Sequence, residues 1–341
     1  MDLRFIELMQ SAKVIVEDLA MVKAGEEALI VTDTRISEYY GTEELFTALV
    51  AAISAVGAEP VIICCSPRKS SADELPAIVG AAMKNAKVIF TILTHGTLQT
   101  LANREAIGNG ARIMALPCGD RMGKLNDMIY RLMPKTKAEV DELAALTRKV
   151  GERFAKGQNV RLTTEKGTDI TMKIFEHADR INTHINTGFL DEPGMLSFAP
   201  TGQNAIGVIP GTANGKVVVD ASIHPLREPL KEPIYMTFEN GLLIDIQGGE
   251  EAQRYKELLA SKNDPRVYNL VEIGTGNNPK AMIMAESLED ERYYGGGHIG
   301  IGANAPFGGD IRCGWHSDAI IYNVTIEIDG ELIMKNGKYL I

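Results

Sequence analysis

The sequence contains no long apolar run, few cysteines and a deficit of positive charge. No stretch approaches the roughly 18 uninterrupted apolar residues of a membrane-spanning helix, so we expect no membrane partner. The N-terminal stretch MDLRFIELMQSAKVIVEDLA has neither the basic start nor the apolar block of a signal peptide. The four cysteines show no C-x-x-C spacing, which favours a reduced, cytoplasmic location. With 35 basic and 45 acidic residues the formal charge is −10, which argues against a nucleic-acid partner.

Apolar segments in the first half of the chain alternate with segments of helical length. At 341 residues the chain is long enough for two domains. The short apolar runs are ALIVTD (28–33), PVIICC (60–65), KVIFTIL (87–93) and RIMALP (112–117). Between them lie patterns typical of helices, such as EELFTALVAAISAVGA. Apolar strands separated by helices predict a mainly parallel sheet covered on both faces. We therefore predict that residues 1–156 form an α/β domain.

The pattern changes after about residue 157. NVRLTTEKGTDITMKI alternates around Lys-Gly, IYMTFENGLLIDIQGG alternates around Asn-Gly, and VTIEIDGELIMKNGKYLI contains both Asp-Gly and Asn-Gly. Such dipeptides between alternating segments predict β-hairpins. EEAQRYKELLASK indicates one helix. We therefore predict that residues 157–341 form a β-rich α+β domain.

The stretch GWHSDAII places His316 and Asp318 at the start of an apolar, β-branched segment. Residues two apart on a strand point to the same face, so both side chains project together. A buried imidazole beside a carboxylate is costly unless the pair is hydrogen-bonded or holds something positive. The pattern therefore makes this pair a candidate metal-binding site.

Two more segments combine a potential ligand with glycine. NLVEIGTGNNP contains Glu272, and GGGHIGIGAN contains His298. Imidazole and carboxylate together suit zinc, iron, manganese or cobalt, and two histidines with a carboxylate are a recurrent iron(II) arrangement. In the alternative interpretation, His298 is a core histidine bonded to the backbone and Glu272 faces solvent. The residues alone leave both interpretations open.

Four segments resemble the thermophilic metallo-aminopeptidase family of the aminopeptidase T and aminopeptidase S type. They occur in the family's order, as GTANGKVVVDASI, EIGTGNNPKA, GGGHIGIGAN and WHSDAIIYNVTIEIDG. The resemblance covers most of the chain. It implies an α/β N-terminal domain, a β-rich C-terminal domain that carries one or two divalent metal ions, and a homodimer. It also implies that Glu272, His298, His316 and Asp318 fall on metal-ligand positions.

Two positions depart from the peptidase pattern. The resemblance aligns Gln203 with the family's first glutamate ligand and Ala305 with a catalytic tyrosine of the peptidases. A neutral amide is a much poorer metal ligand than a carboxylate, and losing the tyrosine removes a transition-state hydrogen bond. A second branch of the resemblance is the relative 2,5-dihydroxypyridine 5,6-dioxygenase, an iron(II) ring-cleaving enzyme. At the position of Glu272 that enzyme has a histidine ligand.

The leading hypothesis is a metal-dependent hydrolase of an amide or peptide C–N bond. It would use zinc, cobalt, manganese or iron(II) to activate water, and its substrate would be a short peptide or another small molecule. The alternative enzyme is a non-haem iron(II) ring-cleaving dioxygenase. His95, at the end of a predicted parallel strand, and His184, in INTHINTG, are candidate catalytic residues. A third possibility, a binding protein that has lost catalysis, predicts no tightly bound metal.

Overall fold

The structure is a computed structural model that describes residues 3–35, 43–71, 73–98, 100–116, 125–175 and 183–341. The chain divides into two compact units. Unit 1 is Met1–Ala144 with Asn186–Thr201, and unit 2 is Ala145–Ile185 with Gly202–Ile341. Helix α7 (Lys137–Lys156) begins in unit 1 and ends in unit 2. None of the helices in the described ranges combines the length and the apolar character that a bilayer crossing needs.

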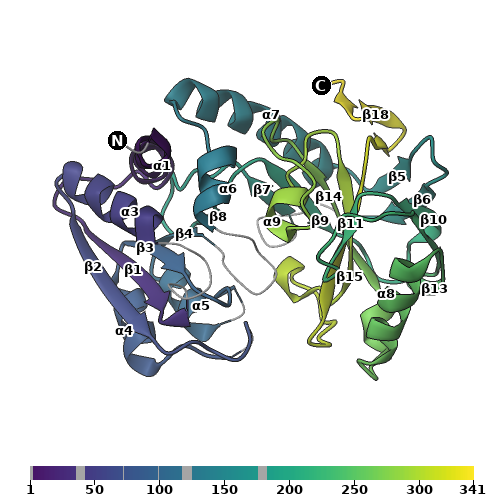
Figure 1. The fold of residues 1–341 in the computed structure, drawn as a ribbon, viewed down its shortest axis with the longest axis horizontal. Helices are drawn as coiled ribbons and strands as arrows, with labels where there is room; N and C mark the ends of the chain where they lie inside the picture. The colour runs from purple at the N-terminus through teal and green to yellow at the C-terminus, as the bar shows by residue number, and fades with distance from the viewer. Residues whose placement is uncertain (1–2, 36–42, 72, 99, 117–124, 176–182) are drawn as a thin grey trace. The chain divides into compact units, whose positions relative to one another are not determined.

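Unit 1 is built on a parallel sheet, whose first strands are the purple and blue arrows of Figure 1. Within the described residues it has five strands in the order β2-β1-β3-β4-β8. The strands are β1 (Glu27–Asp33), β2 (Glu59–Cys65), β3 (Val88–Ile92), β4 (Arg112–Ala115) and β8 (Leu196–Phe198). The helical segments are α1 (Leu3–Lys13), the π-helical η1 (Val14–Leu19), α3 (Glu43–Ala55), α4 (Ala77–Asn85), α5 (Leu101–Gly108) and α6 (Leu125–Leu132).

The apolar runs of the first half form β1 to β4, as predicted. Every residue of β3 is buried, and in β1 only Glu27 is exposed, because central parallel strands are covered on both faces. Strand β2 lies at the edge and leaves Ile62 46% exposed. The fifth strand, β8, follows a stretch of the chain that belongs to unit 2 and pairs with β4 in the sheet of unit 1. The sequence does not signal this return, because three residues are too few to show a periodic pattern.

Unit 2 contains two antiparallel sheets. The eight-stranded sheet has the order β13-β12-β10-β6-β5-β17-β18-β19, and the six-stranded sheet has the order β11-β16-β15-β14-β9-β7, both counted over the described residues. The strands of the eight-stranded sheet are β5 (Asn159–Thr163), β6 (Asp169–Lys173), β10 (Asn214–Val219), β12 (Ile234–Glu239), β13 (Leu242–Gln247), β17 (Thr325–Ile328), β18 (Glu331–Lys335) and β19 (Lys338–Tyr339).

The strands of the six-stranded sheet are β7 (Thr183–Asn186), β9 (Gln203–Gly207), β11 (Ser222–Ile223), β14 (Leu270–Gly276), β15 (Gly297–Gly302) and β16 (His316–Ile321). The helices of unit 2 beyond α7 are α8 (Glu250–Ala260), η2 (Pro265–Tyr268), α9 (Ser287–Asp290) and η3 (Ala305–Phe307). Together with the parallel sheet of unit 1, these sheets confirm the predicted fold class.

The predicted hairpins all form. Asn240 and Gly241 join β12 to β13 with φ values of 49° and 77°. Two successive positive φ values are the requirement of a type I′ turn, and the Asn-Gly dipeptide meets it at little cost. The other dipeptides likewise join β5 to β6, β17 to β18 and β18 to β19. The predicted helix near EEAQRYKELLASK is α8.

One face of each antiparallel sheet contributes to a shared apolar core. The six-stranded sheet supplies Ile273, Ile299, Ile301, Ala319 and Ile321, and the eight-stranded sheet supplies Val160, Leu162, Ile170, Met172, Val217 and Val219. Burying a side chain of the Val or Ile type stabilises the fold by roughly 1.5–3 kcal/mol. Because side chains alternate along a strand, this packing directs the remaining residues of β14, β15 and β16 to the opposite face.

Candidate metal centre

The predicted ligands lie on the face of the six-stranded sheet that is turned away from the shared core. Glu272 comes from β14, His298 from β15, and His316 and Asp318 from β16. In the strand register Gly300 pairs with Glu272 on one side and with Asp318 on the other. The carboxylates of Glu272 and Asp318 therefore lie on either side of Gly300, where no side chain separates them.

Gly300 and Gly274 are needed for this convergence. A Cβ atom at Gly300 would lie 2.7 Å from Cβ of Glu272 and 3.0 Å from the His316 ring. A Cβ atom at Gly274 would lie 2.2 Å from the ring of His298. Distances of 2.2 Å and 2.7 Å are shorter than a Cβ atom tolerates, so the glycines make room for the ionisable side chains of the neighbouring strands.

Glu272, His316 and Asp318 each offer one ligand atom, and these atoms lie within 4.8 Å of one another. Nε2 of His316 is 3.0 Å from Oε2 of Glu272 and 3.2 Å from Oδ1 of Asp318. Its Nδ1 lies 2.8 Å from the carbonyl oxygen of Ala303, which can only accept, so Nδ1 carries a proton. Nε2 then faces two carboxylate oxygens. That arrangement is stable only if Nε2 binds a second proton or shares a cation with them.

The pKa values of His316, Asp318 and Glu272 reflect the same contacts between imidazole and carboxylates. Burial acts to lower the pKa of His316, but the charge of Asp318 and the hydrogen bonds to both carboxylates raise it well above its ordinary value. Burial acts to raise the pKa of both acids. The charge of His316 prevails at Asp318, whose pKa is well below its usual range, and hydrogen bonds from His298 and His316 lower the pKa of Glu272. The group therefore stabilises a positive charge at Nε2, and a divalent ion fits the same place.

The other predicted ligands occupy neighbouring positions. His298 is 1% exposed, and its Nε2 is 3.3 Å from Oε1 of Glu272. Its Nδ1 has no hydrogen-bond partner among the described residues. Gln203 donates its amide N–H to Oε2 of Glu291 at 2.6 Å, so it faces a carboxylate. That His298 and Gln203 bind a metal stays a prediction.

His224 and Glu291 are two further ligand-type residues that the sequence analysis did not single out. With Asp318 they form a second group whose ligand atoms lie within 4.8 Å of one another. His224 follows β11 and Glu291 follows α9, so both lie outside the long strands. The acidic run ESLEDE is typical of a solvated helix, and the histidine in ASIHP carries no spacing signal. Their position next to Asp318 is visible only in three dimensions.

The two candidate catalytic histidines lie in different units. His95 is in unit 1, after β3, where its carbonyl oxygen accepts a hydrogen bond from the guanidinium of Arg68. His184 is in unit 2, on β7, and its ring stacks on Phe307 with the centroids 4.6 Å apart. Neither residue belongs to the two ligand groups found among the described residues.

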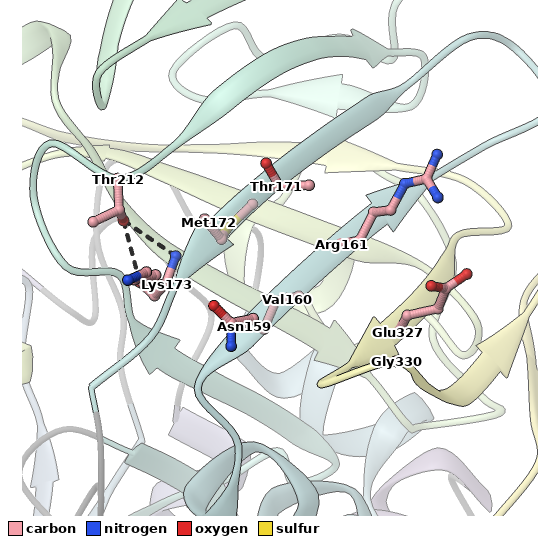
Figure 2. Close-up of a pocket in the computed structure, with 9 residues that line it drawn as sticks. All are labelled: Asn159, Val160, Arg161, Thr171, Met172, Lys173, Thr212, Glu327 and Gly330. Atoms are coloured by element: carbon pink, nitrogen blue, oxygen red, sulfur yellow. Dashed lines mark hydrogen bonds between the residues drawn. The ribbon is translucent and has the colours of Figure 1, made fainter.

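A pocket of about 310 Å³ lies elsewhere in unit 2, on the exposed side of the eight-stranded sheet (Figure 2). Arg161 comes from β5, Thr171 and Lys173 come from β6, and Glu327 comes from β17. Its lining contains none of the predicted ligands. The hollow therefore does not mark the candidate metal centre.

Comparison with known proteins identifies a relationship to a dioxygenase. The family model described as 2,5-dihydroxypyridine 5,6-dioxygenase matches residues 11–341. The 2,5-dihydroxypyridine 5,6-dioxygenase of Pseudomonas putida KT2440 is 29% identical over 161 residues, which are 44% of this chain and 46% of that protein. The chain therefore aligns with slightly less than half the length of this curated relative.

Two solved structures share the fold. The structure of 2,5-dihydroxypyridine dioxygenase from Pseudomonas putida KT2440 has a TM-score of 0.79 and 19% identity, and the match covers 98% of this chain and 97% of that chain. Wild-type AmpT from Thermus thermophilus has a TM-score of 0.68 and 13% identity, with 98% and 99% covered. At these identities the structural matches establish the fold alone.

The predicted main function, hydrolysis of an amide or peptide bond, is wrong, because the family model that matches nearly the whole chain is that of the dioxygenase. The interpretation as an aminopeptidase or metalloprotease fails with it. The relationship that the resemblance indicated is confirmed, but the peptidase identity is not. The segments that carried the resemblance specify a scaffold with ligand-type residues, and such a scaffold serves unrelated chemistries. Gln203 and Ala305, the two departures from the peptidase pattern, were the residues that pointed away from hydrolysis.

Proposed function

Because this chain belongs to the 2,5-dihydroxypyridine 5,6-dioxygenase family, we propose that it is a metal-dependent dioxygenase that opens the ring of a dihydroxylated nitrogen heterocycle. The observation that carries the proposal is the group of Glu272, His316 and Asp318 on one sheet face, in which both carboxylates are buried and the imidazole is partly exposed. The compound 2,5-dihydroxypyridine is the substrate to test first, since it gives the family its description.

The donor set supports a divalent metal ion of the kind that imidazole and carboxylates share, and we propose iron(II). One imidazole and two carboxylates form a compact, negatively charged set of ligands. When bound, iron(II) supplies the one-electron chemistry that lets dioxygen react with an aromatic ring. The second carboxylate, Glu272, adds negative charge, so manganese(II) is the competing ion to test.

In this proposal the surrounding residues fix the ligands before the ion arrives. The carbonyl of Ala303 accepts a hydrogen bond from the Nδ1–H of His316 and thereby turns Nε2 toward the carboxylates. If His298 is not itself a ligand, it acts as a positioning residue in this proposal, since its Nε2 contacts the oxygen of Glu272 that does not face His316. Replacing His298 by glutamine should weaken metal binding by about tenfold to a hundredfold, the usual effect of losing a supporting contact. The dissociation constant for manganese(II) measures this loss.

His184 and His95 remain our candidates for proton transfer. The half-buried imidazole of His184 lies against Phe307 in the same unit as the ligands, so its ring is held in place. If it moves a proton of the substrate, His184→Asn should lower kcat and leave the metal content unchanged. The same comparison applies to His95→Asn.

The function is tested by loading the protein with iron(II) under nitrogen, adding 2,5-dihydroxypyridine and then admitting oxygen. We expect oxygen uptake equal to the amount of substrate lost, with disappearance of the aromatic absorbance. The expected product contains both atoms of dioxygen, which labelled oxygen and mass spectrometry detect. Ring loss without oxygen uptake, or no reaction in protein shown to hold iron, would contradict the proposal.

A further inference from the structure

A buried carboxylate stands at the carboxyl end of the parallel sheet in unit 1. Asp33 is the last residue of β1 and is 4% exposed. Its Oδ2 accepts a hydrogen bond from the backbone N–H of Thr94, and its Oδ1 accepts one from the hydroxyl of Thr94, both at 2.8 Å. The N–H of Arg35 donates a third hydrogen bond, to Oδ1, at 3.1 Å. The carboxylate of Asp33 therefore holds the residue before His95 by both its backbone and its side chain.

A guanidinium holds the next two residues of the same segment. Arg68 follows β2, and its Nη2 donates to the carbonyl oxygen of His95 and, at 2.9 Å, to that of Gly96. Its Nη1 donates to the carbonyl oxygen of Asp73 at 2.8 Å, which fixes the guanidinium itself. Residues 94–96 are thus held by two charged side chains that follow or end the neighbouring strands β1 and β2.

The segment that follows is held by neutral groups. The hydroxyl of Thr100 donates to the carbonyl oxygen of Thr97 at 2.8 Å and accepts the N–H of Asn103 at 3.2 Å. Removing a carboxylate from water opposes folding much more strongly than removing a hydroxyl does. The charged groups at residues 94–96 therefore indicate that this short segment has to stay in one place.

Residues 94–96 lie where the direction of the strand order reverses. Strand β1 lies between β2 and β3, so the connection from β1 to β2 and the connection from β2 to β3 lead in opposite directions. In open α/β sheets, ligands bind at the carboxyl ends of the strands beside such a point. Asp33 ends β1 and Thr94 is the second residue after β3, so their hydrogen bonds join the two strand ends. The half-buried His95 comes next in the chain.

We propose that Asp33 and Arg68 are positioning residues for His95 in the proton transfer of the proposed ring cleavage. By fixing the backbone of residues 94–96 they fix the direction in which the imidazole projects before any substrate binds. Neither side chain touches the substrate, since both act through His95. The inference rests on the proposed function for the step that the imidazole serves, whereas the way in which the imidazole is held can be measured without turnover.

The first measurement follows the imidazole in the metal-free protein by nuclear magnetic resonance. The chain has six histidines, so labelling their rings with carbon-13 gives few signals, and His95→Asn identifies the signal of His95. Asp33→Asn keeps the shape of the side chain but loses the charge and one acceptor oxygen. Arg68→Lys cannot contact three carbonyl oxygens in the geometry of the planar guanidinium. Each variant should shift or broaden the His95 signal and leave the remaining signals in place.

The second measurement uses the proposed reaction in protein loaded with iron(II). Asp33→Asn and Arg68→Lys should each lower kcat for 2,5-dihydroxypyridine by about tenfold to a hundredfold, since a displacement of about 1 Å has an effect of that size. The KM and the dissociation constant for manganese(II) should not change. In the His95→Asn background neither substitution should lower kcat further, because both act through the imidazole.

Matched controls lie at the opposite end of the same sheet. Glu26 directly precedes β1, and its carboxylate accepts hydrogen bonds from Nη2 of Arg112 at 2.8 and 3.0 Å. Nη1 of Arg112 donates to the carbonyl oxygens of Ala20 and Met21 at 2.7 and 2.9 Å, as Arg68 does at its own pair of carbonyls. Glu26→Gln and Arg112→Lys should lower the melting temperature without changing kcat or the ring signal that His95→Asn identifies.

Three results would overturn the inference. One is a His95 signal that stays unchanged in both Asp33→Asn and Arg68→Lys. Another is a loss of kcat that persists in the His95→Asn background, and the third is an equal change of the His95 signal in the control variants. A wild type that holds iron but leaves the substrate intact would instead refute the proposed function. The ring signal would then decide alone whether Asp33 and Arg68 hold His95.

Discussion

The two antiparallel sheets of unit 2 obey the same alternation but use their second faces differently. Each sheet packs one face on the shared core. On the other face of the eight-stranded sheet, Asp169 and Arg161 form an exposed bidentate ion pair with both N···O distances at 2.9 Å. On the other face of the six-stranded sheet, Asp318 is only 8% exposed and contacts His316. The eight-stranded sheet therefore pairs an acid with a base in water. The six-stranded sheet pairs Asp318 with His316 where the carboxylate is shielded from water.

Burial of the second face is what turns ionisable residues into a candidate reactive site. An exposed ion pair contributes little, because water solvates each charge almost as well as its partner does. A buried carboxylate must be compensated by a partner, and removing that partner leaves an uncompensated charge. At Asp318 and His316 this compensation shifts both pKa values strongly in opposite directions. Substitutions on the two faces should consequently differ by orders of magnitude in their effect on metal affinity.

The largest effect is expected for Asp318→Asn. The change keeps the size of the side chain but removes a charge that both ligand groups share. Residues that merely orient a ligand change metal affinity by about tenfold to a hundredfold, so a shared ligand should exceed about a hundredfold. Calorimetric titration with manganese(II) measures the loss, and oxygen uptake should disappear in parallel. Unchanged affinity in the folded variant would show that Asp318 is not a ligand.

Gly300→Ala tests whether convergence depends on the missing side chain. The new methyl group would lie 2.7 Å from Cβ of Glu272, so either the strand or the carboxylate must move. We expect metal affinity to fall by about tenfold to a hundredfold, together with roughly 1–3 kcal/mol of stability from overpacking. The same titration and a urea denaturation series measure both quantities.

The matched control for that substitution is Gly108→Ala at the exposed end of α5. A Cβ atom there meets no atom within 4 Å, and the φ angle is not in the left-handed region. Alanine favours helix over glycine, so stability should be unchanged or slightly higher. If both alanines weaken metal binding equally, the effect of Gly300→Ala does not come from the crowded carboxylate.

Metal affinity should also depend on pH, and one pH unit should change it less than the substitution Asp318→Asn does. The pKa of His316 is raised, so below that pKa a proton occupies Nε2 and must be displaced by the ion. Because binding of the ion displaces one proton, the affinity should fall about tenfold for every pH unit below the raised pKa of His316. Above that pKa the affinity should no longer depend on pH. Titrations with manganese(II) between about pH 6 and about pH 9 measure this slope. A flat profile would mean that Nε2 does not bind the ion.

Local patterns predicted the fold well because they are set by neighbouring residues. Asn240 and Gly241 specify their own turn, and the apolar residues of β1 and β3 specify burial on both faces. Alternation along β16 likewise indicated that His316 and Asp318 share a face. By contrast, the return of residues 196–198 to the parallel sheet depends on pairing with β4, which no local pattern encodes.

The composition of the candidate site was less predictable because it depends on register between distant strands. Glu272 approaches Asp318 only because both pair with Gly300, and the resemblance, not the spacing, suggested that they belong together. His224 and Glu291 lie on short connections beside the sheet, so no periodicity marks them. The reaction itself was misassigned, since the quoted segments specify ligand-type residues that hydrolases and dioxygenases can both use.

The smallest effect is expected on the exposed face, for Asp169→Asn. Hydrogen bonds and the charge of Arg161 lower the pKa of Asp169, yet both side chains are largely in water. Removing the charge should change the melting temperature by less than about 2 °C and leave the affinity for manganese(II) unchanged. Salt should shrink even this difference, because the pair is open to screening. A loss as large as that of Asp318→Asn would refute the view that burial, and not the acid–base pairing itself, separates the two faces.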